Sequence, residues 1–528
     1  MFPPLHKQKM GTSAHSIPKA LVQSMESHHL PFSSISEDDG FLDLNCVKQG
    51  YSYRLRNAGQ FWIPFMSSVV ASLLLRRIWS WWTDELYALD LGVVCMVSCI
   101  ILVTFTHLFR LSKQIYMVEV SCYRAPAAWR VPFHHFIEHA FLCGRFTDKS
   151  IEFQKKILER AALSEQVAVP PHLHLLPPIQ TTDSARQEGE LVMFSCVQDL
   201  LDKTGIHVTE IGILVVNCSV FNPNPSLSSM IVNKFGMRDD IKTFNLGGMG
   251  CSANLIAVDL AKDCLLASNK GTYAIVLSTE NITQNWYFGN HEPMLVSNIL
   301  FRMGCGAVLL TNKRSERHRA KYRLMHVLRT HRAGAGDMAY HAAFQEEDPT
   351  GRVGVCLSKH IMEIAAEALK TNMRSLGPLV LPYHVQILYL SSRFLSKLFK
   401  GSKSMNKQFI PDFRRPFDHI CIHSGGKAVV RAVEKGLNLS SAVTEPSKMV
   451  LYRFGNTSSS STWYQFQYLE SKGRMKKGQK IWQICLGSGF KCNSGVWIVN
   501  RDITPSGDNA WSDCIVDYPV EIPDFCPI

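Results

Sequence analysis

Two long uncharged apolar runs near the amino terminus constrain this 528-residue chain more than any other feature. Residues 57–75 and 91–109 contain no Asp, Glu, Lys or Arg, so each run can cross about 30 Å of hydrocarbon as a helix. The residues before them are rich in Ser, His and Pro without apolar periodicity, which favours a flexible tail over a cleaved signal peptide. We therefore predict a tail over 1–56 and a transmembrane hairpin over 57–112. A buried helical hairpin in a soluble domain is the alternative.

The charges around these runs predict the orientation of the hairpin. Asp84 and Glu85 lie in the connector between the runs, whereas basic residues flank the pair on its outer sides. The flanking residues are Lys48, Arg54, Arg56, Arg110, Lys113 and Arg124. Because basic residues favour the cytosolic face of a membrane, both ends of the hairpin and the rest of the chain are predicted to lie in the cytosol. Arg76 and Arg77, on the connector side, count against this orientation.

The net charge limits the kinds of binding partner that this chain could have, and its cysteine content indicates the redox environment in which it folds. A formal net charge of +12 indicates an acidic partner, such as nucleic acid, an anionic membrane surface or a phosphate-bearing substrate. The sequence has no zinc-finger, helix-turn-helix or aromatic-basic RNA-binding pattern, so no nucleic-acid partner is predicted. The 16 cysteines lack the regular spacing of a disulfide framework, which favours free thiols on the reducing side of a membrane.

Cys251 stands at the start of a predicted helix, directly after a glycine turn. The apolar runs 211–217 and 273–278 on either side are typical of strands buried on both faces. A thiol at the amino end of a helix is shifted toward the thiolate, which is a nucleophile. Gly250 and Ser252 flank the cysteine, and backbone N–H groups in such a turn can approach a developing oxyanion. The alternative is a buried cysteine that only packs.

His423 ends a second predicted strand, over 419–423, and is followed by glycines and a helix ending near Gly436. His419 is four residues earlier. In a strand the two side chains share one face about 13 Å apart, which is too far for a shared metal ion. The spacing therefore predicts no metal site, and it leaves His419 a structural or supporting role.

Two further turns carry polar groups that an active site could use. Asn456 begins a serine run with aromatic and aliphatic residues close on both sides, which indicates a buried turn rather than a polar linker. Gly487, Ser488 and Gly489 form a turn between two apolar runs, and their backbone N–H groups could bind a reacting carbonyl oxygen.

Cysteine, histidine and asparagine in this order, each at a glycine-rich turn, make the sequence resemble the plant 3-ketoacyl-CoA synthases, the condensing enzymes of very-long-chain fatty acid elongation. The resemblance covers roughly residues 50–522. Its motifs include VSCYRAP, GGMGCSA, STENITQNWYFGN, HSGGKAV, FGNTSSSSTWYQ and GSGFKCNSGVW. The sequence departs from the usual pattern of the family at Asn254, Ser424 and Cys305. These departures leave the pocket shape and the substrate preference open.

The resemblance implies an α/β chain with the thiolase fold, in which two similar halves pack as a five-layered αβαβα sandwich, usually as a dimer. Here the halves are predicted over 113–370, with the nucleophile, and 371–528, with the histidine and asparagine. It further implies an endoplasmic reticulum membrane protein that associates with other elongase enzymes in making very long chains, including those of wax and cuticular lipid.

The same resemblance implies the chemistry of the three residues. Cys251 takes an acyl group from a long or very-long-chain acyl-CoA. His423 and Asn456 then stabilise the enolate that malonyl-CoA forms on losing carbon dioxide, and condensation gives 3-ketoacyl-CoA. The substrates are two CoA thioesters, and no cofactor or metal is implied. The eight Lys and Arg residues from Lys313 to Arg332 could bind CoA phosphates or anionic lipid, with a solvated charged face as the alternative.

Three other protein classes have features in common with this sequence. A type III polyketide synthase has the same fold and catalytic residues but is a soluble enzyme, which the apolar runs argue against. A papain-like protease also orders Cys, His and Asn, but its cysteine follows a glutamine and precedes a tryptophan, and GGMGCSA has neither. A catalytically inactive membrane scaffold would keep the fold without a reactive thiol.

Overall fold

The computed structural model describes residues 114–528 except 269–270, 399–410 and 506, and it also places 97–98 and 100–101. The predicted tail over 1–56 and the hairpin over 57–112 therefore lie outside the described residues, apart from those four. None of the described helices is long and apolar enough to cross a bilayer.

The helices and strands alternate along the chain as expected for an α/β protein. The strands are β1 (Tyr116–Cys122), β2 (Ile211–Asn217), β3 (Lys242–Leu246), β4 (Tyr273–Glu280), β5 (Gly304–Thr311), β6 (Tyr322–His331), β7 (Ala343–Glu347), β8 (Val353–Leu357), β9 (His419–Ile422), β10 (Lys480–Gly487) and β11 (Lys491–Val499). The helices are α4 (Phe133–Leu142), α5 (Asp148–Leu158), α6 (Thr182–Thr204), α7 (Leu227–Phe235), α8 (Ala253–Ala267), α9 (Ile282–Asn285), α10 (Glu292–Leu300), α11 (Asp337–Tyr340), α12 (Ile361–Val380), α13 (Tyr383–Leu398), α14 (Lys427–Gly436), α15 (Ser441–Phe454) and α16 (Ser461–Ser471).

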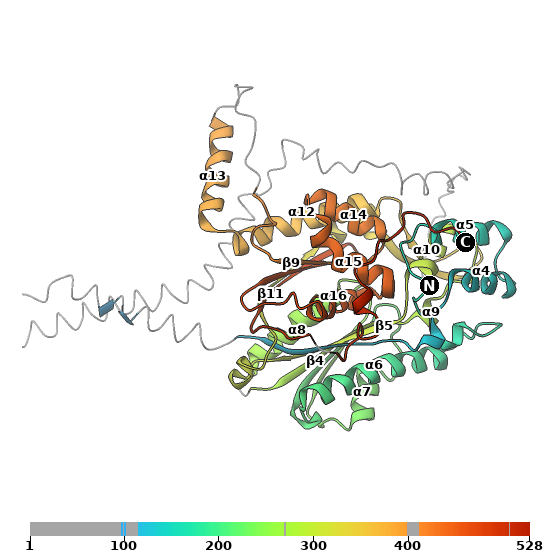
Figure 1. The fold of residues 1–528 in the computed structure, drawn as a ribbon, viewed down its shortest axis with the longest axis horizontal. Coiled ribbons are helices and arrows are strands. Elements are labelled where there is room, and N and C mark those ends of the chain that lie inside the picture. The colour runs from blue at the N-terminus through green and yellow to red at the C-terminus, as the bar shows by residue number, and fades with distance from the viewer. Residues whose placement is uncertain (1–96, 99, 102–113, 269–270, 399–410, 506) are drawn as a thin grey trace, which may run out of the picture.

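Nine strands pair in the order β3-β2-β4-β5-β1-β6-β11-β10-β9, and β7 and β8 form a separate hairpin. β1 pairs with β5 along its length, but only Tyr116 and Met117 pair with β6, so the two sections of the sheet meet at a short junction. Helices α8 and α16 lie between the two sections, α6 covers the outer face of one and α12 the outer face of the other (Figure 1). This arrangement confirms the predicted five-layered α/β architecture.

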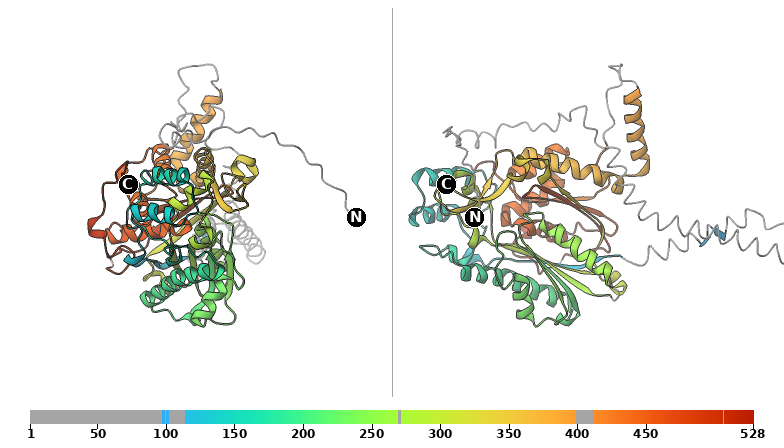
Figure 2. Two further views of the ribbon diagram at one scale, coloured as in Figure 1. Left: turned by 90° about the vertical axis from the view of Figure 1, so that its right-hand side faces the viewer. Right: turned by 180° about the vertical axis from the view of Figure 1, so that it is seen from behind.

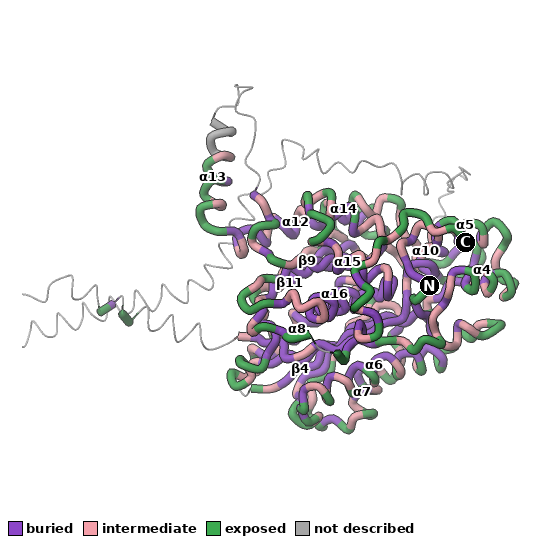
Figure 3. Tube along the Cα trace, viewed as in Figure 1, coloured by how far each residue is buried: buried purple, intermediate pink, exposed green. Residues whose placement is uncertain are grey.

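The central strands β2, β4 and β5 are apolar at most positions because both of their faces are buried. In β4, Tyr273, Ile275 and Leu277 point into the core beneath α6, whereas Ala274 and Val276 point into the core around α8 and α16. Alternate residues of a strand point to opposite faces, so a strand with a core on each side needs apolar residues at every position. Figure 3 shows the consequence as nearly continuous burial along β4, α16 and β9.

The elements predicted around the candidate site are present. The strand expected over 211–217 is β2, and the helix expected to close at Gly236 is α7, where Gly236 has a φ of 56°. The strand expected from His419 is β9, and the helix expected to end near Gly436 is α14. The division of the chain at residue 370 stays a prediction.

Candidate active site

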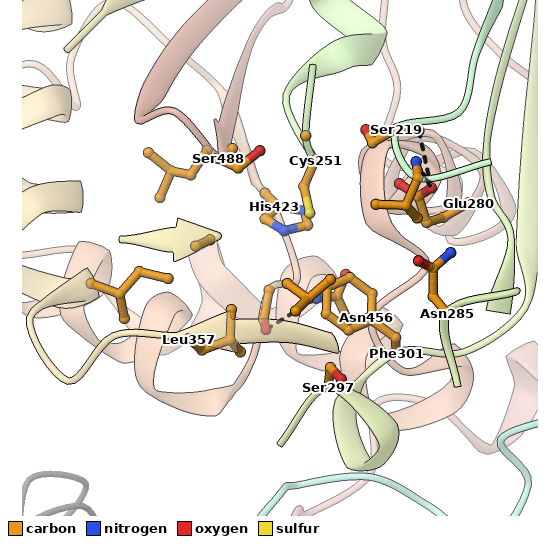
Figure 4. Close-up of a pocket in the computed structure, with 18 of the residues that line it drawn as sticks. Ser219, Cys251, Glu280, Asn285, Ser297, Phe301, Leu357, His423, Asn456 and Ser488 are labelled. Atoms are coloured by element: carbon orange, nitrogen blue, oxygen red, sulfur yellow. Dashed lines mark hydrogen bonds between the residues drawn. The ribbon is translucent and has the colours of Figure 1, made fainter. Parts of the chain in front are cut away.

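Cys251, His423 and Asn456 line one cavity of about 150 Å³. They come from three separate parts of the chain, namely the turn before α8, the residue after β9 and the turn after α15. Figure 4 shows the Cys251 side chain directed toward the imidazole of His423, with Asn456 beside them. The structure therefore brings the three residues together, while their catalytic roles stay a prediction.

The turn before α8 holds Cys251 against the turn between β10 and β11. Gly250 has a φ of 71°, and a Cβ on it would lie 2.5 Å from the backbone nitrogen of Ser488. A Cβ on Gly487 would in turn lie 2.7 Å from the backbone nitrogen of Ser252. Only glycine fits at contacts this short. Gly487 and Ser488 line the cavity, and their role as N–H donors to a reacting carbonyl oxygen stays a prediction.

His423 is held by its backbone and by one nitrogen of its ring. Its backbone N–H donates to the carbonyl oxygen of Ile484 at 2.8 Å, which continues the pairing of β9 with β10. Its ring Nδ1 lies 2.8 Å from the hydroxyl oxygen of Ser461. A Cβ on Gly425 would come within 3.0 Å of Nε2, so the glycine after the strand leaves this nitrogen accessible from the cavity.

Asn456 is buried, and both its backbone and its side chain are held. Its N–H donates to the carbonyl oxygen of Leu300 at 2.9 Å, and its own carbonyl oxygen accepts from the N–H of Arg302 at 3.0 Å. The amide Oδ1 accepts from the N–H of Ser458 at 2.9 Å, and Nδ2 donates to the carbonyl oxygen of Gly425 at 3.2 Å. An amide nitrogen has two hydrogens, so one N–H remains for a substrate.

Ser458 and Glu280 belong to the site although the sequence did not single them out. Ser458 has a φ of 54°, which is rare for a residue other than glycine and is typical of functional sites. Its hydroxyl donates to Glu280 Oε2 at 3.1 Å and is near enough to the thiol of Cys251 to lower the pKa of that thiol. The only sequence signal was the expectation that this serine run forms a buried turn whose polar groups need partners, which is what the structure contains.

Burial keeps both the thiol and the imidazole neutral. It raises the pKa of Cys251 to about 12, against the lowering effect of the Ser458 hydroxyl, and the nearby Glu280 carboxyl raises it further. Burial also lowers the pKa of His423 to about 4. The thiolate expected at the helix amino end is therefore wrong for the substrate-free protein. A helix dipole contributes about 0.3–1 kcal/mol at most exposed sites, and desolvation of a charged group exceeds this.

The remaining predicted residues lie around the site or away from it. Ser252 is buried beneath the turn, and Gly489, with a φ of 100°, packs against the Lys491 side chain. His419 is at the opposite end of β9 from His423, and its Nε2 contacts the carbonyl oxygen of Arg474 at 3.2 Å. His419 does not line the cavity, and its structural or supporting role stays a prediction. Within the described part of the chain, no group of three or more His, Cys, Asp or Glu could hold a metal ion.

Two family models match this chain. Residues 107–399 match the model for FAE1/type III polyketide synthase-like proteins. Residues 415–499 match the model for the C-terminal part of 3-oxoacyl-[acyl-carrier-protein] synthase III. The first match contains Cys251, and the second contains His423 and Asn456.

Known proteins and solved structures agree with these matches. The chain is 49% identical to 3-ketoacyl-CoA synthase 4 of Arabidopsis thaliana over 91% of its own length and 93% of that relative. It is 47% identical to 3-ketoacyl-CoA synthase 9 of the same plant, over 91% and 94%. A fungal type III polyketide synthase structure, ORAS, covers 73% of the chain and is itself 99% covered, at a TM-score of 0.55 and 17% identity, which shows a shared fold. The chain therefore belongs to the 3-ketoacyl-CoA synthase family.

Proposed function

We propose that this protein is a membrane-anchored 3-ketoacyl-CoA synthase that condenses malonyl-CoA with a long or very-long-chain acyl-CoA through an acyl group on Cys251. The observation that carries the assignment of the site is that a thiol, an imidazole and a carboxamide from three distant segments line one cavity. Membership of the 3-ketoacyl-CoA synthase family supports the condensation reaction. The shared cavity supports the assignment of Cys251, His423 and Asn456 as the residues that carry it out.

The first half of the reaction moves the acyl group onto Cys251. Because the thiol and His423 are both neutral, the thiol proton passes to the unprotonated Nε2 of His423 as the sulfur attacks the thioester carbonyl. The carbon–sulfur bond to CoA then breaks, CoA leaves as a thiolate that takes a proton from solvent, and the thiol proton stays on Nε2. Backbone N–H groups of Cys251 and Ser488, at the two turns that meet beside the cavity, are suited to bind the transient oxyanion.

The second half uses His423 and Asn456 together. With the thiol proton now on Nε2, Nε2–H of His423 and the second Nδ2–H of Asn456 donate to the thioester oxygen of malonyl-CoA while its carboxylate leaves as carbon dioxide. The resulting carbanion attacks the acyl carbonyl on Cys251. The sulfur leaves as a thiolate and recovers its proton from Nε2 of His423, and the product is 3-ketoacyl-CoA. Ser461, at Nδ1, is placed to accept from Nδ1–H and so to keep Nε2 unprotonated in the substrate-free enzyme.

Expression in a host that lacks very-long-chain products tests this proposal. The wild type should produce fatty acids longer than those of the host, and Cys251→Ala should produce none at equal protein level. A purified-enzyme assay with a phenylpropanoid starter, run beside the long acyl-CoA, separates the proposal from polyketide synthesis. Turnover of the aromatic starter alone would contradict it.

We further propose that the end of the sheet away from the active site faces an anionic cytosolic membrane surface. β1 begins at Tyr116, soon after the apolar run 91–109, and Tyr116 pairs with Thr311 and Arg323. The basic turn between β5 and β6 therefore lies beside the start of β1. β6 runs for about 30 Å from this turn toward the catalytic end, at roughly 3.3 Å per residue. The exposed cations of the turn are Arg314, Arg317 and Arg319.

Other elements at the same end suit a lipid surface. The N–H of Gly478 donates to the carbonyl oxygen of Val499, so the turn with exposed Lys476 and Lys477 also lies here. Helix α13 stands away from the body at this end (Figures 1 and 2), with Ile387 65% and Leu388 53% exposed. Basic residues beside apolar ones are typical of surfaces that bind anionic membranes.

Hydrogen exchange of the full chain in lipid nanodiscs tests this orientation. The turn after β5 should exchange more slowly in anionic than in zwitterionic nanodiscs, and the double variant Arg314→Glu, Arg317→Glu should lose the difference. Lys156→Glu, Lys359→Glu, which reverses two exposed charges elsewhere, is the matched control. Equal exchange in both lipids would contradict the proposal.

We also propose that the protein resides in the endoplasmic reticulum, forms a homodimer and associates with other elongase enzymes. Crosslinking in the intact membrane tests the homodimer and the association with other enzymes.

A further inference from the structure

The catalytic cavity is too small for the substrate of the proposed reaction. Its volume is about 150 Å³. An apolar cavity of about 150 Å³ holds a molecule the size of benzene, which has far fewer carbons than a long acyl chain. When the thioester carbon sits at Cys251, most of the acyl chain must therefore lie beyond the present walls of this cavity.

A second cavity of about 250 Å³ lies directly behind one wall residue. Trp286 lines both cavities, and its indole meets the ring of Phe136 edge-on with centroids 5.9 Å apart. Phe136 belongs to α4 and also lies against Arg302, whose N–H bonds the carbonyl oxygen of Asn456. The second cavity is thus adjacent to the catalytic residues, with the indole as the shared wall.

The lining of the second cavity is mostly apolar. Its apolar residues come from α4 and the residues just before it, from the segment after α5 and from the segment after α9, and they include Val131, Phe136, Ala140, Val169, Leu173 and Phe288. Its polar lining consists of Gln154, three histidines, Arg130 and Glu138. Glu138 is exposed, Arg130 is half-buried and paired with Asp513, and burial lowers the pKa of His174 so that it stays neutral. None of these three side chains therefore places an unpaired buried charge in the path of an acyl chain.

The outer rim of the second cavity is an exposed apolar patch. Leu142 at the end of α4 and Leu176 line the cavity and are 56% and 51% exposed. Phe141, Leu175 and Ile179 beside them are 64%, 46% and 41% exposed. Nε2 of His139 contacts the carbonyl oxygen of Leu175 at 3.0 Å, which holds α4 and this segment together. Contiguous exposed apolar side chains of this kind usually mark a binding surface.

The backbone at Trp286 is anchored, so a change in the wall involves the side chain alone. Nε2 of Gln180 donates to the carbonyl oxygens of Gln284 and Trp286, at 3.0 and 2.8 Å. Rotation of the indole would join the two cavities without moving the chain that carries it.

We propose that Trp286 is the inner boundary of the acyl site, and that long acyl chains displace its indole to occupy the second cavity and its apolar rim. This inference rests on the proposed condensing activity and adds the path of the acyl chain and the residue that limits its length. Chains short enough for the catalytic cavity would leave the indole in place.

Substitutions on the two sides of the indole test the path. Trp286→Leu opens the wall, and Ala140→Phe places a ring in the second cavity, which is large enough to hold one. His134→Phe is the matched control, since His134 is exposed on α4 and does not line the cavity. The readouts are the acyl-enzyme mass and the condensation rate of the full-length enzyme, with one short and one long saturated acyl-CoA.

The result expected is a change in the ratio of long-chain to short-chain rates. The ratio should fall at least about tenfold in Ala140→Phe and should rise in Trp286→Leu, because pocket walls discriminate chain length by about this factor for small changes in size. A ratio in Ala140→Phe equal to that of His134→Phe would overturn the inference while leaving the condensing activity intact. A wild type inactive with every acyl-CoA would instead overturn the proposed function.

Discussion

Ser461 and His423 form a buried pair, with the serine hydroxyl oxygen 2.8 Å from Nδ1 of the imidazole. The hydroxyl occupies the nitrogen that faces away from the substrate, and Nε2 is left for the cavity. The pair is neutral because burial lowers the pKa of His423 to about 4. A neutral imidazole can accept a proton in acyl transfer and donate a hydrogen bond during decarboxylation, so the mechanism depends on this partner.

Replacing Ser461 by alanine should slow both half-reactions without unfolding the protein. The variant loses one hydrogen bond, worth about 0.5–1.5 kcal/mol, and with it the preference for the proton on Nδ1, which leaves Nε2 free to accept the thiol proton. We expect the condensation rate to fall by about tenfold. Ser461→Thr, which keeps the hydroxyl, should recover much of the rate. Alanine and threonine variants with wild-type rates would show that the hydroxyl does not orient the imidazole.

Alkylation of Cys251 should accelerate with pH over the whole accessible range. With a pKa of about 12, the thiolate fraction grows about tenfold per pH unit from neutrality to pH 10. The rate at which iodoacetamide modifies the Cys251 peptide, followed by mass spectrometry, measures this directly. A plateau below pH 8 would mean that the free enzyme already holds a thiolate.

Replacing Gly487 by alanine should damage the site through the backbone. The new Cβ would lie 2.7 Å from the nitrogen of Ser252, so the two turns must separate and the N–H groups they present would move. Overpacking of this kind costs about 1–3 kcal/mol of stability. We expect a lower denaturation midpoint and a severe loss of activity. Gly334→Ala is the control, because a Cβ there meets nothing within 4 Å, and it should resemble wild type in both assays.

Asn456→Ala should separate the two half-reactions. Loading of Cys251 does not use the carboxamide, so the acyl-enzyme should still form. Decarboxylation and condensation should fall by about 10²–10³, the usual effect of removing one donor to a developing oxyanion. Quenched-flow measurement of the acyl-enzyme beside product formation distinguishes the steps. Equal losses in loading and condensation would indicate a role for Asn456 in structure alone.

Much of the fold and the three central residues could be predicted because they depend on local patterns. Strands such as β2 and β4 are apolar at successive positions. The glycines near Cys251 and His423 indicate turns regardless of the tertiary contacts around them. The convergence of the three residues came from a family resemblance, since no local pattern shows that segments so far apart in the sequence meet.

The remaining features depend on contacts between distant segments. The protonation state of Cys251 is set by burial, which outweighs the local effect of the helix end. Among four consecutive serines, only the backbone conformation distinguishes Ser458 as the partner of Cys251 and Glu280. The position of Trp286 between two cavities follows from its packing against α4, which precedes it by more than a hundred residues.

The central claim is that an acyl group on Cys251 is the intermediate that malonyl-CoA consumes. Intact-mass analysis of the purified enzyme after mixing with a long acyl-CoA, before and after a chase with malonyl-CoA, tests it most directly. The account predicts one acyl group per chain, mapped to the Cys251 peptide, that disappears on the chase as an equal amount of 3-ketoacyl-CoA is formed. An acyl group on another residue, or 3-ketoacyl-CoA formed by Cys251→Ala, would contradict it.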